Sequence, residues 1–203
     1  GMFVTNNKTK SGFEARFPNY PLQEMNGGFN FLNKLISQRA DYLVVTKGTR
    51  NFPWRIVVIS ENDEALANND MVQRLSEPSK IKDISWIKPG KVAWDWWNDW
   101  NIYNVNFQAG INTETYKYYI DFASKNKVEY VVLDEGWSVE TNIMEHNPKV
   151  DLKALIAYCK EKNVDIILWA SWMALHENID AIFKNYADLG VKGFKVDFID
   201  RDD

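Results

Sequence analysis

The sequence has few of the residues that build thiol, zinc or serine-hydrolase chemistry. Among its 203 residues are one cysteine, Cys159, and two histidines, His146 and His176. A single cysteine cannot close a disulfide within the chain, and Cys159 lies in a helical pattern, so we predict a small core residue. The histidines lack the close spacing of catalytic zinc ligands, and no G-x-S-x-G motif is present. Zinc and Ser-His-Asp hydrolysis are therefore excluded.

Long apolar runs and a strong charge of one sign are also missing. No apolar run approaches the roughly 18 to 20 residues that span a membrane. The formal net charge is −4, with acidic and basic residues interspersed, which disfavours a nucleic acid or an anionic membrane as partner. No signal peptide precedes the first strand-like segment. We interpret Gly1 as the remnant of a tag, so an export signal of the natural protein would have been removed.

Tryptophan, by contrast, is abundant and clustered. The chain has nine tryptophans, and four of them fall within seven residues, namely Trp94, Trp96, Trp97 and Trp100. An indole face packs well against the C–H face of a sugar ring, and its N–H can bind a hydroxyl group. Packing in a crowded core is the alternative for any one of these side chains. The cluster as a whole favours a carbohydrate ligand.

Residues 1–85 are predicted to be mostly β structure. Strand-like stretches are expected at residues 12–17, 42–46 and 54–60, separated by proline and glycine. A short helix is expected near residues 70–75. Lys88-Pro89-Gly90 then marks a boundary, after which the pattern changes.

From Lys91 onward, predicted strands and helices alternate. Strands are expected at residues 91–97, 129–133, 164–170 and 191–196. Apolar stripes at helical spacing lie between them, at 116–123, 152–159 and 179–186. Asn112 and Asp151 are suitable N-caps, and Gly190 is a suitable helix stop. The order β-α-β-α-β-α-β indicates a parallel sheet.

Two folds contain this alternation, a (β/α)8 barrel and a doubly wound open sheet. An open sheet that binds nucleotides normally has a glycine-rich loop after its first strand. Here that position holds Trp96-Trp97-Asn98-Asp99-Trp100, so the barrel is favoured. Four strands cannot close a barrel of eight, and we expect the sequence to be incomplete as a catalytic unit.

Polar residues follow each predicted strand, where barrel enzymes build their sites. Strand one ends in Trp94-Asp95-Trp96, strand two in Asp134-Glu135-Gly136-Trp137, and strand four in Lys195-Val196-Asp197. Carboxylates accept hydrogen bonds from hydroxyl groups, and aromatic faces stack on sugar rings. The pattern predicts that Trp94, Asp134, Trp137, Lys195 and Asp197 line one rim that binds a sugar.

The strand ends resemble glycoside hydrolase family 97, which contains α-glucosidases and α-galactosidases. The resemblance covers residues 86–203 through three ordered motifs, at 88–98, 131–137 and 193–203. Residues 52–60 are also similar to the end of that family's N-terminal β-sandwich. The implied fold is α/β, with the first four strands of a (β/α)8 TIM barrel at 86–203, preceded by part of a β-sandwich domain at 1–85.

The resemblance implies that Asp197 is the nucleophile of the retaining, α-galactosidase-like branch. A retaining enzyme needs a second carboxyl group about 5 to 5.5 Å from its nucleophile to act as acid and base. In the family, that group and most ligands of a calcium site come from segments outside this sequence. Calcium is therefore expected in the parent protein, but no metal ligand and no acid/base residue can be assigned here.

Five residues are expected to bind the substrate, namely Trp94, Asp134, Glu135, Trp137 and Lys195. By resemblance, Lys195 binds sugar hydroxyls and keeps the nucleophile ionised; a structural salt bridge is the alternative. Asp134 and Glu135 resemble paired acids that hold hydroxyls far from the anomeric carbon, although one of them can instead cap the next loop. Trp137 is either a ring platform or a core residue. The charged run at 200–203 is predicted to be a solvated loop.

The predicted function is retaining hydrolysis of terminal α-galactosides by the parent protein. The alternatives are an inverting α-glucosidase of the same family and a non-catalytic carbohydrate-binding fragment. The 203 residues alone are expected to be inactive. The family implies a periplasmic or secreted protein. The strand at 193–197 is predicted to be an open apolar edge, which favours a homo-oligomer or a longer parent chain.

Overall fold

The computed structural model describes residues 3–6, 8 and 12–200. The chain forms two compact units, one containing residues 1–43 and 90–203, the other residues 44–89. No helix among the described residues is both long and apolar enough to cross a membrane.

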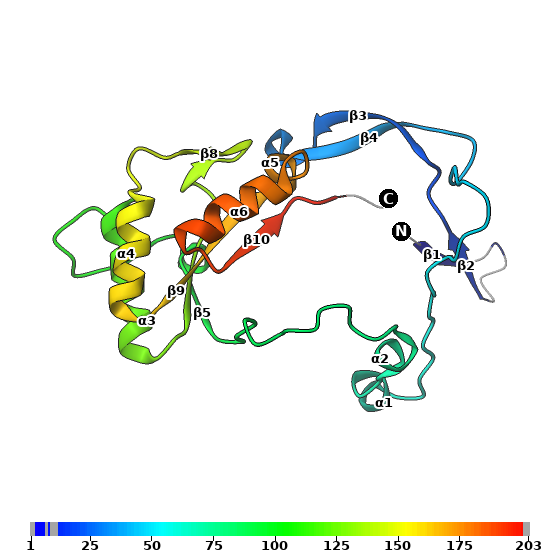
Figure 1. Ribbon diagram of the computed structural model, residues 1–203, viewed down its shortest axis with the longest axis horizontal. Coiled ribbons are helices and arrows are strands. Elements are labelled where there is room, and N and C mark those ends of the chain that lie inside the picture. The colour runs from blue at the N-terminus through cyan, green and yellow to red at the C-terminus, as the bar shows by residue number, and fades with distance from the viewer. Residues whose placement is uncertain (1–2, 7, 9–11, 201–203) are drawn as a thin grey trace. The chain divides into compact units, whose positions relative to one another are not determined.

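A parallel four-stranded sheet is the centre of the larger unit (Figure 1). Its strands are β5 (Val92–Trp94), β6 (Tyr130–Leu133), β9 (Asp165–Ser171) and β10 (Gly193–Asp197), in the spatial order β10-β9-β6-β5. The register pairs Lys195 with Trp169 and Val132 with Ile167. All four predicted strands are confirmed. No other strand of the described residues joins this sheet, so it is not a closed barrel.

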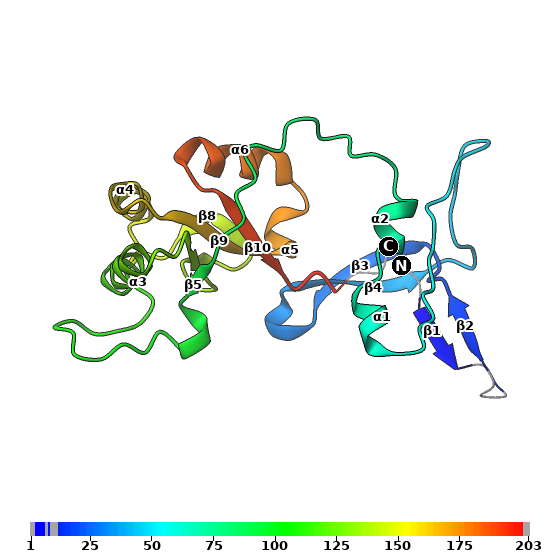
Figure 2. The same ribbon diagram turned by 90° about the horizontal axis from the view of Figure 1, so that it is seen from below.

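Three helices connect successive strands of the sheet. They are α3 (Thr113–Asn126), α4 (Leu152–Lys162) and α6 (Ile179–Leu189), and α3 lies beside α4 (Figures 1 and 2). The Asn112 side chain accepts a hydrogen bond from the Thr115 amide, and Asp151 accepts one from Ala154, which confirms both predicted caps. Gly190, at φ 108°, ends α6 in the left-handed conformation that favours glycine.

The core lies between the sheet and these helices. Its fully buried side chains include Tyr116, Ile120, Leu133, Leu155 and Leu168. Burying one such side chain contributes about 1.5 to 3 kcal/mol to folding. Cys159 is also buried in this cluster, which confirms its predicted role as a small core residue.

Two short insertions at the strand ends were not predicted. The first is a hairpin of β7 (Ser138–Val139) and β8 (Asn142–His146) after β6. The second is a single helical turn, α5 (Trp172–Leu175), directly after β9. Both follow the C-terminal ends of strands, the positions where barrel enzymes place functional loops.

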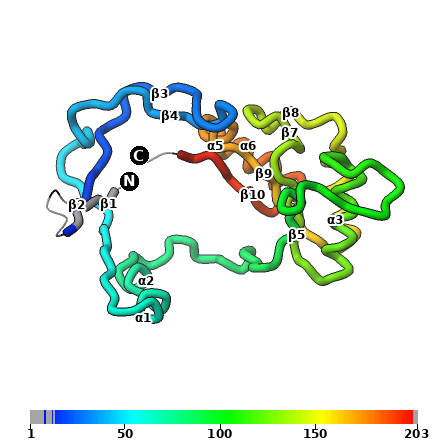
Figure 3. Tube along the Cα trace, turned by 180° about the vertical axis from the view of Figure 1, so that it is seen from behind, coloured from blue at the N-terminus to red at the C-terminus, as the bar shows by residue number. Residues whose placement is uncertain are grey.

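The N-terminal residues form two antiparallel hairpins. Strand β1 (Phe3–Asn6) pairs with β2 (Phe13–Arg16), and β3 (Pro21–Gly27) pairs with β4 (Asn33–Arg39). A 3-10 turn, η1 (Phe29–Phe31), joins β3 to β4. Strand β4 packs against α5 (Figure 3). Strand β2 confirms the expected strand at 12–17, whereas β3 and β4 were not predicted. Their membership of a β-sandwich stays a prediction, as does the boundary at residue 85.

The smaller unit contains two short helices, α1 (Asp63–Ala67) and α2 (Met71–Leu75). Helix α2 confirms the expected helix near 70–75. The predictions of strands at 42–46 and 54–60 were wrong, because both stretches lack regular structure. Their β-branched residues favour extended backbone, but no strand in the described part of the chain pairs with them, and Val45 and Ile59 are 69% and 92% exposed.

Candidate active site

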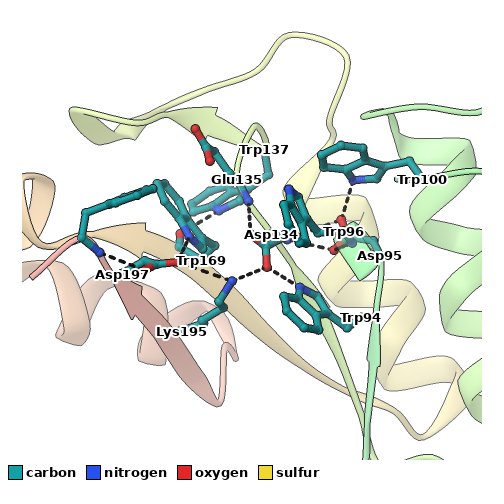
Figure 4. Close-up of polar contacts among 11 residues, drawn as sticks. Trp94, Asp95, Trp96, Trp100, Asp134, Glu135, Trp137, Trp169, Lys195 and Asp197 are labelled. Atoms are coloured by element: carbon teal, nitrogen blue, oxygen red, sulfur yellow. Dashed lines mark hydrogen bonds and ion pairs between the residues drawn. The ribbon is translucent and has the colours of Figure 1, made fainter. Parts of the chain in front are cut away.

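The C-terminal edge of the sheet brings together four of the five side chains that were predicted to share a rim. Trp94 ends β5, Asp134 directly follows β6, and Lys195 and Asp197 belong to β10 (Figure 4). Because the strands are parallel, their C-terminal ends lie at one edge of the sheet. Side chains that are far apart in the sequence therefore meet there.

Lys195 is the central residue of this group. Its Nζ atom lies 2.7 Å from Asp134 Oδ2 and 3.6 Å from Asp197 Oδ2. The same atom is 4.7 Å from the ring centroid of Trp94, which is a cation–π distance. Lys195 and Asp197 are two residues apart in one strand, and the alternation of side chains places them on the same side, as expected. One ammonium group thus contacts both carboxylates and the indole.

Asp134 is almost completely engaged by the protein. Its side chain is 3% exposed, and its Oδ2 atom accepts hydrogen bonds from Trp94 Nε1 and Lys195 Nζ. Its Oδ1 atom accepts from the Glu135 amide at 2.8 Å, so the carboxylate caps the loop that follows β6. The loop-capping alternative is therefore observed, and a contact with a sugar hydroxyl stays a prediction.

Asp197 is the more accessible carboxylate, with 43% of its side chain exposed. Its Oδ1 atom accepts from the Phe198 amide at 2.9 Å, and its Oδ2 atom lies 3.4 Å from Trp169 Nε1. This environment is polar, yet it leaves one face of the group open. A half-exposed, oriented carboxylate beside a lysine is suited to attack an electrophilic carbon. In the charged run, Asp200 is exposed as expected, and residues 201–203 lie outside the described residues.

Glu135 lies beside this group and is half-buried. Burial raises the pKa of its carboxyl group, and the negative charges of Glu140, Asp134 and Asp197 raise that pKa further. Lys195 acts in the opposite direction but does not outweigh these effects. Glu135 therefore binds a proton more readily than a free glutamate side chain does.

Trp137 does not lie in the rim as predicted. Its side chain is 0% exposed, and its Nε1 atom donates to the backbone oxygen of Trp169 at 2.9 Å. Its ring packs edge-on against Tyr186, with 5.7 Å between centroids. Neither ring face is open to a sugar, so the predicted platform is not supported and Trp137 is a core residue.

The tryptophan cluster after β5 divides into exposed and partly buried members. The Trp94 ring stacks with Trp96 at 5.8 Å and with Trp97 at 5.4 Å between centroids. Trp96 and Trp97 are 48% and 76% exposed, whereas Trp100 is partly buried against the core. Trp96 and Trp97 thus form an exposed aromatic surface beside Trp94, which itself contacts Asp134 and Lys195.

Asp95 is a site residue to which the sequence analysis gave no role. It is 0% exposed and accepts hydrogen bonds from Trp100 Nε1 at 2.8 Å, the Trp96 amide at 2.9 Å and the Asp134 amide at 3.2 Å. Burial raises its pKa to about 6. Asp95 connects the end of β5 to the end of β6 and to the tryptophan loop. The sequence signal that could have indicated this role is an acidic residue between two tryptophans at the end of a predicted strand.

Calcium, which the family resemblance implies, stays a prediction, because most of its ligands are expected outside this sequence. Within residues 3–6, 8 and 12–200 there is no group of three or more His, Cys, Asp or Glu residues that could hold a metal ion. Asp134 and Asp197 are both near the Lys195 ammonium, which disfavours a cation between them.

Comparison with known proteins gives consistent matches along the chain. Residues 96–203 match the family model for glycoside hydrolase 97, and residues 1–78 match the model for the glycosyl-hydrolase 97 N-terminal region. The chain is 46% identical over its whole length to a retaining alpha-galactosidase of Bacteroides thetaiotaomicron, and covers 31% of that relative. It is 27% identical, over 80% of its length, to a probable retaining alpha-galactosidase of Streptomyces bingchenggensis, and covers 26% of it.

A solved structure gives the same result for the fold. The chain resembles a glycoside hydrolase family 97 enzyme in complex with acarbose from Pseudoalteromonas sp. strain K8, with a TM-score of 0.56 and 26% identity. The match covers 66% of this chain and 23% of that structure. The chain thus spans 31% and 26% of the lengths of the two curated relatives.

Proposed function

Because the chain belongs to glycoside hydrolase family 97, we propose that it supplies the nucleophile and part of the sugar site of a retaining α-galactosidase. The observation that carries this proposal is the half-exposed carboxylate of Asp197, held 3.6 Å from Lys195 at the sheet edge. The 46% identity to a retaining alpha-galactosidase supports the choice of substrate and stereochemistry.

In the proposed reaction, the Asp197 carboxylate attacks the anomeric carbon of a terminal α-galactoside. The bond to the leaving oxygen breaks as an acid supplied by another part of the protein protonates that oxygen. The resulting galactosyl ester on Asp197 is then hydrolysed by water, which the same group activates as a base. Two inversions at the anomeric carbon give net retention.

The neighbours of Asp197 have supporting roles in this proposal. Lys195 offsets negative charge on Asp197 in the free enzyme and can donate to a sugar hydroxyl through a proton that is not used by Asp134. Asp134 holds Lys195 and Trp94 in place. Glu135 lies at the start of the loop after β6, where its carboxyl group can accept from a hydroxyl distant from the anomeric carbon. Trp94 offers an indole next to the ammonium group.

The four-stranded sheet is proposed to be the first half of a (β/α)8 barrel, with residues 1–85 as part of a β-sandwich domain. The matches to the catalytic and N-terminal family models support this assignment. The acid/base residue would come from the remaining strands. Calcium binding and a periplasmic or secreted location are proposed for the parent protein on family grounds alone. The edge of β10 is proposed to pair with a fifth strand or with a second copy of the chain.

The sequence analysis gave two alternative functions. An inverting α-glucosidase is favoured by the match to a family member that binds acarbose, but that match has lower identity than the alpha-galactosidase. A non-catalytic sugar-binding fragment would bind galactose without turnover. Proton NMR of the first anomer released separates these functions. α-Galactose from an aryl α-galactoside indicates the retaining α-galactosidase, β-glucose from an aryl α-glucoside indicates the inverting α-glucosidase, and no product from either substrate indicates a binding role.

The proposal is tested with Asp197→Gly in the full-length protein that contains this sequence. The variant should lose hydrolysis. Azide should restore cleavage of an aryl α-galactoside by entering the space of the lost carboxylate and attacking the anomeric carbon, which releases the phenol and forms β-galactosyl azide. Asp200→Gly is the matched control, because Asp200 is an exposed acid three residues away with a φ of 42° that glycine adopts readily. Full activity of Asp197→Gly without azide would remove Asp197 from the mechanism.

A further inference from the structure

The tip of the β3–β4 hairpin contacts the residue that follows the proposed nucleophile. Asn33 Nδ2 donates to the backbone oxygen of Phe198 at 3.2 Å, across 165 residues of sequence. The ring of Phe29 stacks on the ring of Phe198, with 5.6 Å between centroids and 20° between planes. These residues belong to one compact unit. The N-terminal part of the chain therefore reaches the end of β10.

Phe198 has a backbone conformation that needs such support. Its φ is 53°, in the left-handed region, which bulky residues with a Cβ atom rarely occupy. A strained residue of this kind costs about 1 to 3 kcal/mol and persists only where its surroundings hold it. Here the surroundings are the Asn33 amide on the carbonyl, Phe29 on one side of the ring, and the edge contact with Trp169 at 6.0 Å.

The conformation of Phe198 determines the orientation of Asp197. The Phe198 amide donates to Asp197 Oδ1 at 2.9 Å, so the direction of this N–H bond fixes one carboxylate oxygen. Trp169 contacts both residues, through its Nε1 atom to Asp197 Oδ2 at 3.4 Å and through its ring to Phe198. Because Asn33, Phe29 and Trp169 hold the carbonyl and the ring of Phe198, they restrict rotation of the peptide plane between Asp197 and Phe198. A rotation of that plane would turn the Phe198 amide away from the carboxylate.

The hairpin tip is packed tightly around the Asn33 amide. Asn33 is 4% exposed although it is polar. Gly28 lies so close that a Cβ atom there would be 2.0 Å from Asn33 Oδ1, and its φ is +70°. Position 28 thus requires glycine, because a Cβ atom would clash with Asn33 and because the positive φ disfavours other residues. This packing leaves the Asn33 amide group little freedom except to point toward Phe198.

We propose that Asn33 is a positioning residue of the reaction, which holds the left-handed turn at Phe198 and thereby aims the Asp197 carboxylate at the anomeric carbon. This inference rests on the proposed function, because it assumes that Asp197 is the nucleophile. It assigns the N-terminal hairpin a part in catalysis that goes beyond packing. Displacement of a reacting group by about 1 Å can cost about 100-fold in rate.

The test measures nucleophilic attack directly in the full-length protein. A 5-fluoro-α-galactosyl fluoride forms a slowly hydrolysed ester with a galactosidase nucleophile, so its labelling rate constant reports how well Asp197 is aimed. Asn33→Ala should lower this rate constant about 10- to 100-fold, with galactose affinity changed less than about twofold. Asn26→Ala is the matched control, since Asn26 is an exposed asparagine in the same hairpin. It should label at the wild-type rate.

Two features keep the test decisive if Asn33→Ala folds poorly. The labelling rate constant is a property of the folded, reactive molecules alone. A smaller folded fraction lowers the final extent of labelling and leaves this rate constant unchanged. The second variant, Gly28→Ala, leaves Asn33 intact but forces its amide to move, and it should show the same loss of rate. A wild-type rate constant in Asn33→Ala, or in Gly28→Ala where Asn33→Ala does not fold, would overturn the inference.

The failure of the proposed function is distinguishable from the failure of this inference. If the wild-type protein is labelled on another residue or not at all, Asp197 is not the nucleophile and both proposals fall. If the wild type and Asn33→Ala are labelled on Asp197 at the same rate, only the role of Asn33 is wrong. Peptide mass spectrometry after digestion identifies the labelled residue in each case.

Discussion

Lys195 extends across β9 and places its ammonium nitrogen 2.7 Å from Asp134, which follows a strand that is not its neighbour in the sheet. This contact joins the ends of β6 and β10. Replacing Lys195 by methionine should leave the 3%-exposed Asp134 carboxylate without its cation. We expect the free energy of unfolding to fall by about 1 to 3 kcal/mol, measured by urea titration of the full-length protein. Lys192→Met, at an exposed position, should change it by less than about 0.5 kcal/mol.

Asp95 should give the protein a pH dependence opposite to that of an ion-paired acid. Burial raises its pKa from 3.8 to about 6, with the charge of Asp134 as a smaller contribution in the same direction. Because the folded protein then binds this proton more tightly than the unfolded chain, the contribution to stability is fully present below about pH 4. It is lost as the pH rises through about 6, and the total change is about 3 kcal/mol.

Asp95→Asn removes this titration and supplies the measurement. The unfolding free energy of the wild type minus that of the variant should decrease as the pH rises from 4 to 6, and should be flat above pH 7. Urea titrations at pH 4, 5, 6, 7 and 8 measure the difference. The asparagine loses an acceptor oxygen, which adds an offset that does not depend on pH. A difference that stays constant from pH 4 to 7 would contradict the raised pKa.

Trp137 should behave as a core residue in both stability and binding. Trp137→Phe keeps an aromatic ring but loses the Nε1 donor, which leaves the buried Trp169 carbonyl oxygen without this partner. We expect a loss of about 1 to 3 kcal/mol in unfolding free energy and no change in galactose affinity of the folded protein. Trp97→Phe, at a side chain that is 76% exposed, should be nearly neutral for stability. Weaker galactose binding by folded Trp137→Phe would restore the ring-platform interpretation.

Gly136 should be intolerant of any side chain. Its φ is +109°, and a Cβ atom would lie 2.5 Å from Ile111 Cδ1. The end of the isoleucine side chain can move, but the backbone conformation remains unfavourable, so Gly136→Ala should cost about 1 to 3 kcal/mol. Gly48→Ala is the control for backbone strain alone, because nothing lies within 4 Å of the added carbon at φ +57°. Thermal unfolding compares the two variants, and we expect a lower midpoint temperature for Gly136→Ala than for Gly48→Ala.

The α/β part of the fold was readable from the sequence because local and tertiary signals agree there. Asn112 and Asp151 cap helices whose apolar stripes face a buried sheet, and Gly190 ends the third helix. In residues 42–46 and 54–60 the local signal was β-branched content alone, and none of the strands that the structure describes pairs with these stretches. The opposite error affected β3 and β4. Their residues are largely polar or exposed, so the sequence lacks a clear alternation there.

The candidate site was readable to the same extent. Strand ends placed Trp94, Asp134, Lys195 and Asp197 correctly, because parallel strands send their C-terminal residues to one edge. Which way a residue points in the following loop is set by tertiary packing, and for this reason Trp137 was misplaced. The contact from Asn33 to Phe198 connects residues 165 positions apart and depends on a left-handed φ. No local sequence pattern encodes such a pairing.

The order of the strands in the parallel sheet has a consequence for synthesis of the chain. Strands β5, β6, β9 and β10 are adjacent in space in the same order in which they occur in the sequence. Each strand can therefore join the edge left by its predecessor as it emerges from the ribosome, and none has to insert between two strands that are already paired. The exception is Phe198, whose partners Phe29 and Asn33 are translated long before it. The contacts of the hairpin tip with Phe198 can therefore form only after about 170 further residues have been made.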